Sequence, residues 1–355
     1  MSNSNNLTAA QRASMFAQAT RQNMQMLPSA SANTDLTSLQ FTLPKARLLS
    51  SIMAWVEVKV KATHGSTGGN LKVPFADVHN IIRRWSLDLN NGFSPYTVGG
   101  RELYYLNALN GTKGYYDIMD AEDKTVNGTI AMEYNPSGAV NTIAFPVEMP
   151  VTINERDAVG LILLQNDQTN VTLTADVNNV NNVFKADGVT FAVENITITP
   201  LVTTFSVPAM SDAFPDLSVL KLVNSRVDNY SGAGQHIVRL STGTIYRRMV
   251  VRFTDENGTP LTVDEITSNI DIVFNQADVN YSIAPKLLRA LNSKMYGYQL
   301  PDGVYSFDFT YQGIANMGGS RDFIDTERLT EFWLRFSTSK TVKVEIVTEC
   351  LARLQ

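Results

Sequence analysis

The chain has 355 residues, of which 44% are hydrophobic and 18% are charged, and its formal net charge is -5. At roughly 150 residues per domain, this length predicts two globular domains, each with its own core. The low charge and the many Asn, Thr and Val residues are typical of strands joined by polar turns. The negative charge argues against direct binding of nucleic acid, which needs a basic surface.

Three compositional features bear on where the protein is made. A single cysteine, Cys350, excludes an intrachain disulfide and a cysteine-based zinc site. The longest apolar run, Ala158–Leu164, is far shorter than the ~20 residues of a transmembrane helix. Residues 1–30 interleave Gln, Arg and Thr with apolar positions, so a secretory signal is not expected. We expect a protein that is made and used without secretion.

The first 34 residues differ in chemistry from the rest of the chain. Arg12 and Arg21 are their only charged side chains, because the first acidic residue is Asp35. Thr8 followed by Gln11 has the spacing of a helix capping box. Seven apolar or small residues then recur at helical spacing: Ala10, Ala13, Phe16, Ala17, Thr20, Met24 and Leu27. This pattern predicts an amphipathic helix from Thr8 to Leu27.

From Asp35 onward the hydrophobic period changes from 3.6 to 2. Val56, Val58 and Val60 alternate with charged residues, which is typical of a strand with one buried face. Similar short strands, separated by turn signals such as Asn127-Gly128, continue to the C-terminus. So many short strands predict a pair of antiparallel sandwiches or barrels, not a parallel sheet with helical crossovers.

Two short helices interrupt the strands at related places. The segments 101–110 and 286–292 share the letters Ala-Leu-Asn at an offset of 182, and the strands 56–63 and 249–256 correspond at an offset of 193. The order of the neighbouring elements repeats as well, which indicates two copies of one β unit joined near Pro200. We predict a helical arm over 1–34 and two β units over 35–200 and 201–355.

Two tandem β units with one inserted helix each resemble the double jelly-roll major capsid proteins of icosahedral double-stranded DNA viruses. The segment 145–151, then Asp157, 160–164 and 171–174, is similar to the closing strands of that family's first jelly roll. Length and the Gln-rich arm look most like the tectiviruses that infect Bacillus and its relatives. The resemblance implies an all-β fold of two tandem eight-stranded antiparallel jelly rolls, with short inserted helices and an N-terminal helix.

The same resemblance implies a structural role. It describes a coat protein whose homotrimers combine six jelly rolls into pseudo-hexameric blocks, which tile a shell over an internal lipid membrane. The implied partners are further copies, minor capsid and vertex proteins, and the viral membrane, without direct contact to nucleic acid. The implied locations are the virion and, during assembly, the host cytoplasm.

The N-terminal helix is the one segment for which the sequence indicates a second surface. Its large apolar side chains are too few to bury much alone, and its arginines would attract anionic headgroups. The alternative is that the helix packs under the jelly rolls. The predicted membrane-proximal residues are Arg12, Met15, Phe16, Arg21, Met24 and Leu27.

No catalytic, cofactor or metal site is predicted. His64, His79 and His236 lie far apart in the sequence. The acidic cluster over 117–123 lacks the spacing of a calcium loop, and no serine nucleophile motif occurs. Two alternatives to a coat protein stay open at this point: a carbohydrate- or receptor-binding β-sandwich such as a viral attachment protein, and a hydrolase on a double jelly roll.

Overall fold

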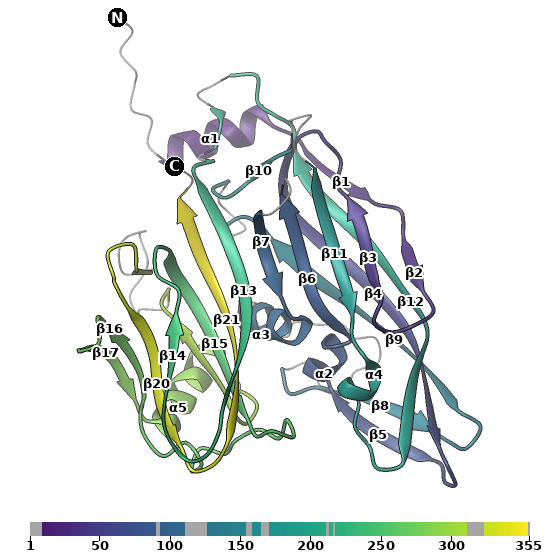
Figure 1. Cartoon of the computed structure of the whole chain (residues 1–355). Helices are drawn as coiled ribbons and strands as arrows, with labels where there is room; N and C mark the ends of the chain where they lie inside the picture. The colour runs from purple at the N-terminus through teal and green to yellow at the C-terminus, as the bar shows by residue number, and fades with distance from the viewer. Residues whose placement is uncertain are drawn as a thin grey trace, which may run out of the picture.

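The computed structural model describes residues 9–89, 93–110, 126–153, 158–164, 170–210, 213–215, 217–310 and 323–353. Short antiparallel strands dominate it, as the period of 2 predicts (Figure 1). In the long strand β4, the apolar residues that alternate with charged ones, among them Val56, Val58 and Val60, are buried. The alternation therefore has the expected cause, which is one face in the core.

The first half of the chain contributes twelve strands. They are β1 (Gln22–Met26), β2 (Ala30–Ala32), β3 (Ser38–Thr42), β4 (Leu48–His64), β5 (Gly69–Pro74), β6 (Ile82–Leu89), β7 (Phe93–Val98), β8 (Thr129–Tyr134), β9 (Ala139–Pro150), β10 (Ile162–Leu163), β11 (Val171–Val177) and β12 (Val189–Phe205). The second half contributes β13 (Val219–Tyr230), β14 (Gly234–Leu240), β15 (Ile245–Thr254), β16 (Ile270–Phe274), β17 (Asp278–Ile283), β18 (Val304–Asp308), β19 (Ile324–Asp325), β20 (Phe332–Thr338) and β21 (Val342–Arg353).

In the described part of the chain, five helices accompany the strands. They are α1 (Ala9–Ala19), α2 (Phe75–His79), α3 (Gly100–Asn110), α4 (Val180–Val183) and α5 (Pro285–Tyr296). The predicted inserted helices correspond to α3 and α5. Each of them follows the last strand of a four-strand layer, β7 or β17, and precedes the edge strand of the other layer, β9 or β18.

The two halves have the same strand order. In the first half β1, β12, β4 and β9 form one layer and β3, β11, β6 and β7 the other. In the second half β13, β21, β15 and β18 match the first layer, and β14, β20, β16 and β17 match the second. Each half is an eight-stranded antiparallel jelly roll, so the predicted double jelly roll is confirmed. Below, the two halves are called roll 1 and roll 2.

The rolls are joined along one edge. β7 of roll 1 and β13 of roll 2 run side by side in a short parallel pair, with Tyr96 opposite Val223 and Thr97 opposite Asn224 (Figure 1). One layer of roll 1 thereby continues into one layer of roll 2 as a nine-stranded sheet. Each roll also has its own large cluster of buried apolar residues.

The N-terminal segment departs from the predicted helix. The helix α1 ends at Ala19, and residues 22–26 form β1, which pairs along its whole length with β12. The prediction of a helix up to Leu27 is therefore wrong beyond α1, because these residues instead form backbone hydrogen bonds with β12 as an edge strand of its sheet. β1 and β2 complete a sheet of roll 1, and β12 continues through Pro200 to Phe205. Domain boundaries at 34 and 200 stay a prediction.

Candidate assembly interface

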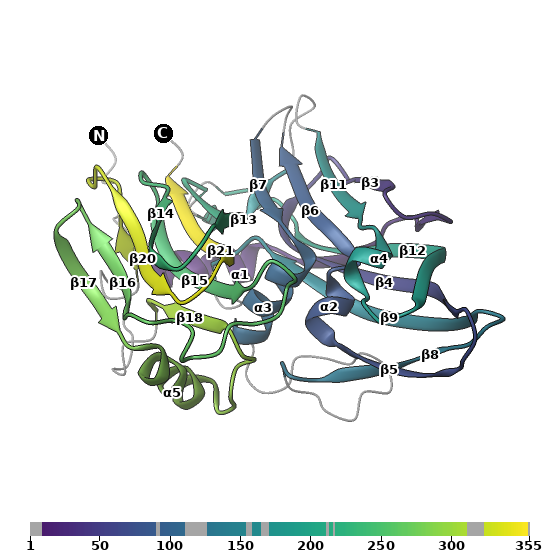
Figure 2. The same ribbon diagram turned by 60° about the horizontal axis from the view of Figure 1, so that its bottom comes forward.

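The two rolls meet at the outer face of β15 and β21 in roll 2. Val250 on β15 pairs directly with Val347 on β21, and both belong to the apolar cluster of roll 1. Val347 is only 2% exposed although it lies outside the core of its own roll. The helix α3 contacts both strands and lies between the two rolls (Figure 2). Roll 1 therefore covers this face of roll 2.

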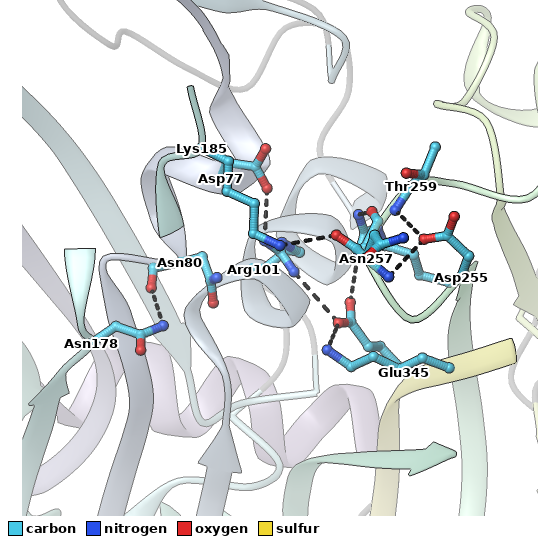
Figure 3. Close-up of polar contacts among 12 residues, drawn as sticks. Asp77, Asn80, Arg101, Asn178, Lys185, Asp255, Asn257, Thr259 and Glu345 are labelled. Atoms are coloured by element: carbon cyan, nitrogen blue, oxygen red, sulfur yellow. Dashed lines mark hydrogen bonds and ion pairs between the residues drawn. The ribbon is translucent and has the colours of Figure 1, made fainter. Parts of the chain in front are cut away.

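One group of buried charges lies at the start of α3. Arg101 places Nη2 2.7 Å from Asp77 Oδ1 in roll 1 and Nη1 3.4 Å from Glu345 Oε1 in roll 2 (Figure 3). Arg252 Nη1 lies 2.8 Å from the other oxygen of Glu345, and Lys343 Nζ lies 2.9 Å from Oε1. Burial opposes the ionisation of Glu345, but these three cations outweigh it and lower its pKa to about 2.

A second group of buried charges surrounds Glu349 on β21. Its oxygens lie 3.4 Å from Lys221 Nζ, 3.3 Å from Arg247 Nε and 3.8 Å from Arg248 Nη1. The register of β15 against β21 shifts between Tyr246 and Arg248, so a β-bulge directs two successive arginines at one carboxylate. Burial raises the pKa of Glu349, and the three cations outweigh it, so the pKa lies below its ordinary value. The carboxylate stays charged inside the contact.

A cavity of about 710 Å³ opens beside the Arg101 group, between the rolls. Its lining includes Glu345 and the three cations that pair with it, Arg101, Arg252 and Lys343, together with residues of α4 and of the turn after β15. Lys185 crosses the gap and donates from Nζ to the carbonyl oxygen of Asn257 at 2.9 Å (Figure 3). The cavity thus belongs to the contact that holds the rolls together.

Sequence reasoning missed these charged residues, although a signal for them exists. Arg248 and Arg252 are four residues apart on β15, and Glu345 and Glu349 are four apart on β21. A spacing of four places each pair on one face of its strand. In the sheet, Arg248 lies opposite Glu349 and Arg252 opposite Glu345. Complementary charges within two otherwise apolar strands could have indicated a second buried face.

The helices α3 and α5 occupy equivalent positions in the two rolls. Asn107 of α3 donates its amide to the carbonyl oxygen of Glu148 on β9, and Asn292 of α5 donates to that of Ser306 on β18. Lys286 Nζ lies 2.8 Å from Asp264, which repeats the pair of Arg101 with Asp77. The helices therefore correspond at an offset of 185, not the offset of 182 inferred from the shared letters.

The strands β4 and β15 correspond through a shared bulge. The register of β4 against β12 shifts at Ser50, between Ser51 and Leu49, as that of β15 shifts at Arg247. This correspondence gives an offset of 197, and the pairing of β9 with β4 and β18 with β15 gives the same value. The offset of 193 inferred from the sequence is therefore wrong. Met53 and Leu201 of roll 1 are the counterparts of Val250 and Val347 in roll 2.

The structure divides the predicted membrane-proximal residues among three surroundings. Phe16 is buried against Leu48 and Leu161, and its ring centroid lies 5.5 Å from that of Phe205. Leu27 is buried in the core of roll 1, whereas Met24 is exposed on β1. The other three predicted residues, Arg12, Met15 and Arg21, are exposed or half-buried.

Residues considered for chemistry are not brought together. Among the described residues, no three His, Cys, Asp or Glu side chains are grouped as metal ligands would be. His79 stacks on Tyr104 inside roll 1, and His236 lies beside Thr338 in roll 2. Within 231–236, Gly232 and Gly234 have positive φ, as expected for a turn. The acidic cluster over 117–123 lies outside the described residues.

Several solved structures share this architecture. The major capsid protein of STIV has a TM-score of 0.68 and 14% identity, over 94% of this chain and 97% of that chain. PBCV-1 VP54 has a TM-score of 0.61 and 10% identity, over 95% of each chain. The major capsid protein P2 from bacteriophage PM2 has a TM-score of 0.50 and 11% identity, over 94% and 98%. At these identities the likeness shows the fold, and these neighbours are double jelly-roll viral capsid proteins.

Searches by sequence add no relative. No protein-family profile matches the chain, and no match to a curated protein was found. Within the described part of the chain, no helix has both the length and the apolar character of a bilayer-spanning segment. The proposal for function therefore depends on the fold and on the contact between the rolls.

Proposed function

We propose that this chain is the major capsid protein of an icosahedral virus of bacteria with a double-stranded DNA genome and an internal membrane. Three copies associate into a block of six jelly rolls, and the blocks tile the shell together with minor capsid and vertex proteins. The protein acts without catalysis or a cofactor. It accumulates in the host cytoplasm before it enters the virion, and the internal membrane separates it from the nucleic acid.

The observation that carries this proposal is the side-by-side packing of two equivalent rolls. The contact is built from apolar pairs such as Val250 and Val347 and from charges that are buried and paired, such as Arg101 with Glu345. Such a contact holds the rolls in one orientation, because a displaced roll would leave buried charges unpaired. A fixed pair of equivalent rolls is a building block that can repeat around an axis. The capsid proteins of similar fold, over nearly the whole chain, support this role.

The test of this proposal is the assembly state of the purified protein. We expect sedimentation velocity to show a complex of three 39.2 kDa chains, and electron micrographs of the same sample to show blocks with six-fold outline. Obligate interfaces commonly bury more than about 2,000 Å², so the complex should survive dilution to nanomolar concentration. A stable monomer at micromolar concentration would overturn the proposal.

The membrane contact is the finer part of the proposal. Near one end of the molecule, Phe16 anchors α1 to Leu48 at the beginning of β4, and Arg12 and Arg21 are exposed. Each arginine adds about 1 kcal/mol of attraction to an anionic surface. We propose that this end faces the internal membrane and that many weakly bound copies act together.

Vesicle binding tests the membrane contact. With vesicles of phosphatidylglycerol and phosphatidylcholine at low salt, Arg12→Glu with Arg21→Glu should weaken binding by at least ~30-fold. The matched control is Lys59→Glu with Lys61→Glu, which makes the same charge change toward the other end of β4 and should leave binding less affected. Equal losses in both double variants would show attraction by net charge alone and would contradict a specific membrane-facing end.

A further inference from the structure

The helix α5 carries an apolar stripe that its own roll does not cover. Leu287 is 64% exposed and Leu291 is 39% exposed, and Ala290 and Lys294 beside them are also exposed. These four residues follow the spacing of one helix face, whereas Leu288 and Asn292 face the core of roll 2. Roll 1 approaches α5 at its C-terminal end, where Tyr296 packs against the apolar cluster of roll 1, and Figure 2 shows the helix itself on roll 2.

The equivalent stripe of α3 is buried in the contact between the rolls. At the offset of 185, Ala290 corresponds to Tyr105, Leu291 to Leu106 and Lys294 to Leu109. All three residues of α3 are buried and belong to the cluster that includes Val250 and Val347 of roll 2. The same helix face is thus covered in one roll and exposed in the other.

The sheet face that α3 covers also has an uncovered counterpart. Val250 and Val347 correspond to Met53 and Leu201, which are half-buried on the outer face of β4 and β12. On the neighbouring strand, Val223 of roll 2 is fully buried, whereas its counterpart Met24 is 60% exposed and Met26 is 67% exposed. Roll 1 therefore presents a row of large apolar side chains at positions that a neighbouring roll covers in roll 2.

We propose that α5 of one copy packs on the outer face of β1, β12 and β4 of a second copy, in the manner in which α3 packs on β13, β21 and β15 within the chain. This inference rests on the proposed function and names the surfaces of the subunit contact. The acidic residues Glu57 and Glu148 border the face, opposite in sign to Lys286 and Lys294 of α5.

The geometry makes this contact heterologous, because each copy contributes one helix and one sheet face. Contacts of this kind close into a ring when the rotation between neighbours divides the circle. The trimer of the proposed function requires each contact between rolls to repeat a rotation of about 60°, so that three chains of two rolls close the ring. The N-terminal strand β1 then lies inside the subunit contact through Met24 and Met26, and not against lipid.

Single-surface variants test the contact. Leu291→Asp removes the helix surface and Met53→Asp removes the sheet surface, and each should weaken self-association at least ~30-fold in sedimentation velocity. The control Val279→Asp, at a 40% exposed valine on β17, should leave trimers intact. Thermal melting of each variant, followed by circular dichroism, checks that the rolls remain folded.

Mixing the two defective variants distinguishes this contact from any other. A Leu291→Asp chain keeps its sheet face and a Met53→Asp chain keeps its helix, so an equimolar mixture should form one-to-one dimers and nothing larger. Trimers that persist in both variants would overturn the proposed surfaces while leaving the proposed function intact. A wild-type protein that stays monomeric would overturn both.

A cross-linking experiment avoids any dependence on folding of the aspartate variants. A chain with Leu287→Cys and Met53→Cys, treated with a short thiol-reactive cross-linker, should give covalent dimers and trimers and no higher species. Cys350 is 5% exposed, so it should not react. The same chain with Val279→Cys in place of Leu287→Cys should give no covalent trimer. Equal products from both chains would overturn the contact.

Discussion

The outer face of β4 and β12 and the outer face of β15 and β21 have the same backbone geometry but different side chains. Both strand pairs carry a bulge at the same position, where roll 1 has Ser50 and Ser51 and roll 2 has Arg247 and Arg248. Opposite the bulge, Thr203 of roll 1 takes the place of Glu349. Only the face in roll 2 is covered within the chain. The covered face thus carries buried ion pairs, whereas the uncovered face has Ser50, Ser51 and Thr203 at the equivalent positions and the charged Glu57 and Glu148 only at its border.

The physical reason lies in when each contact forms. Burying an ion pair costs the hydration free energy of both charges, but the pair then fixes the orientation of the groups that carry them. Within one chain the partner groups are always present. A face that must stay in water before a second copy arrives cannot hold unpaired buried charges. Methionine side chains adapt to a new neighbour, which suits a face that is covered later. Three pairs of equivalent substitutions and one pH experiment compare the two rolls, in order of decreasing effect.

The largest effect is expected at Glu349. Glu349→Ala leaves Lys221, Arg247 and Arg248 buried without their carboxylate, so the free energy of unfolding should fall by about 3–5 kcal/mol. The counterpart Thr203→Ala in roll 1 should cost less than about 1 kcal/mol, because no buried charge depends on it. Urea denaturation of both variants measures the difference. Equal losses would contradict the distinction between the two faces.

The next effect concerns the asparagines of α5 and α3. Asn292 makes two hydrogen bonds to the main chain of Ser306, and Asn292→Ala should destabilise the protein by about 2–4 kcal/mol. Asn107 makes one comparable bond, to Glu148, so Asn107→Ala should cost about half as much. Thermal unfolding of the two variants gives the ratio. A larger loss for Asn107→Ala would show that the bond count does not set the cost.

The third comparison uses pH, because His79 lies in the core of roll 1. Burial lowers the pKa of His79 to about 3, from an ordinary value of 6.5. The unfolded chain therefore binds a proton that the folded chain does not, and stability is lost as the pH falls below 6.5. Between pH 7.5 and pH 5 this loss should be about 2 kcal/mol. In His79→Phe that part of the pH dependence should disappear, which urea denaturation at both pH values would show.

The smallest effect distinguishes a covered residue from an uncovered one. Val347→Ala removes the equivalent of two buried methyl groups from the contact. It should lower the free energy of unfolding of the isolated chain by about 1.5 kcal/mol. Its counterpart Leu201→Ala should cost less than about 0.5 kcal/mol in the isolated chain, since Leu201 is half-exposed there. If Leu201→Ala is the more costly of the two in a monomeric background, the face of roll 1 is not free in the single chain.

Much of the fold could be predicted from local patterns. The alternation at Val56, Val58 and Val60 predicts a half-buried strand, and β4 confirms it. The segments near 101 and 286 are helices, as expected. The repeat was correctly inferred from the order of the elements, but its register was wrong because the letters Ala-Leu-Asn coincide by chance. The true register depends on the roles of Asn107 and Asn292, which a spacing in sequence does not show.

The N-terminal segment shows where local patterns mislead. The residues Ala10, Ala13 and Phe16 have helical spacing, and all three lie in α1. The pattern was extended to Met24 and Leu27, although Met24 and Met26 also fit a period of 2. The period of 2 prevails because β12 is long enough to accept β1 as an edge strand. A short segment that fits two hydrophobic periods adopts the structure that lets it pair with a strand distant in the sequence.

The hydrophobic pattern of the sequence is enough to predict antiparallel strands in two related units, because the period of the hydrophobic residues indicates which face of each strand is buried. Tertiary structure alone decided which outer face is covered. Glu345 and Glu349 lie on the outer face of β21 and are buried because roll 1 lies over that face, and Glu345 also pairs with Arg101 of roll 1. Leu287 and Leu291 remain exposed because the apolar cluster of roll 1 contacts α5 at Tyr296 and not at these two residues. The physical reason is that burial on a second face depends on neighbours far away in sequence, about which a strand's own alternation carries no information.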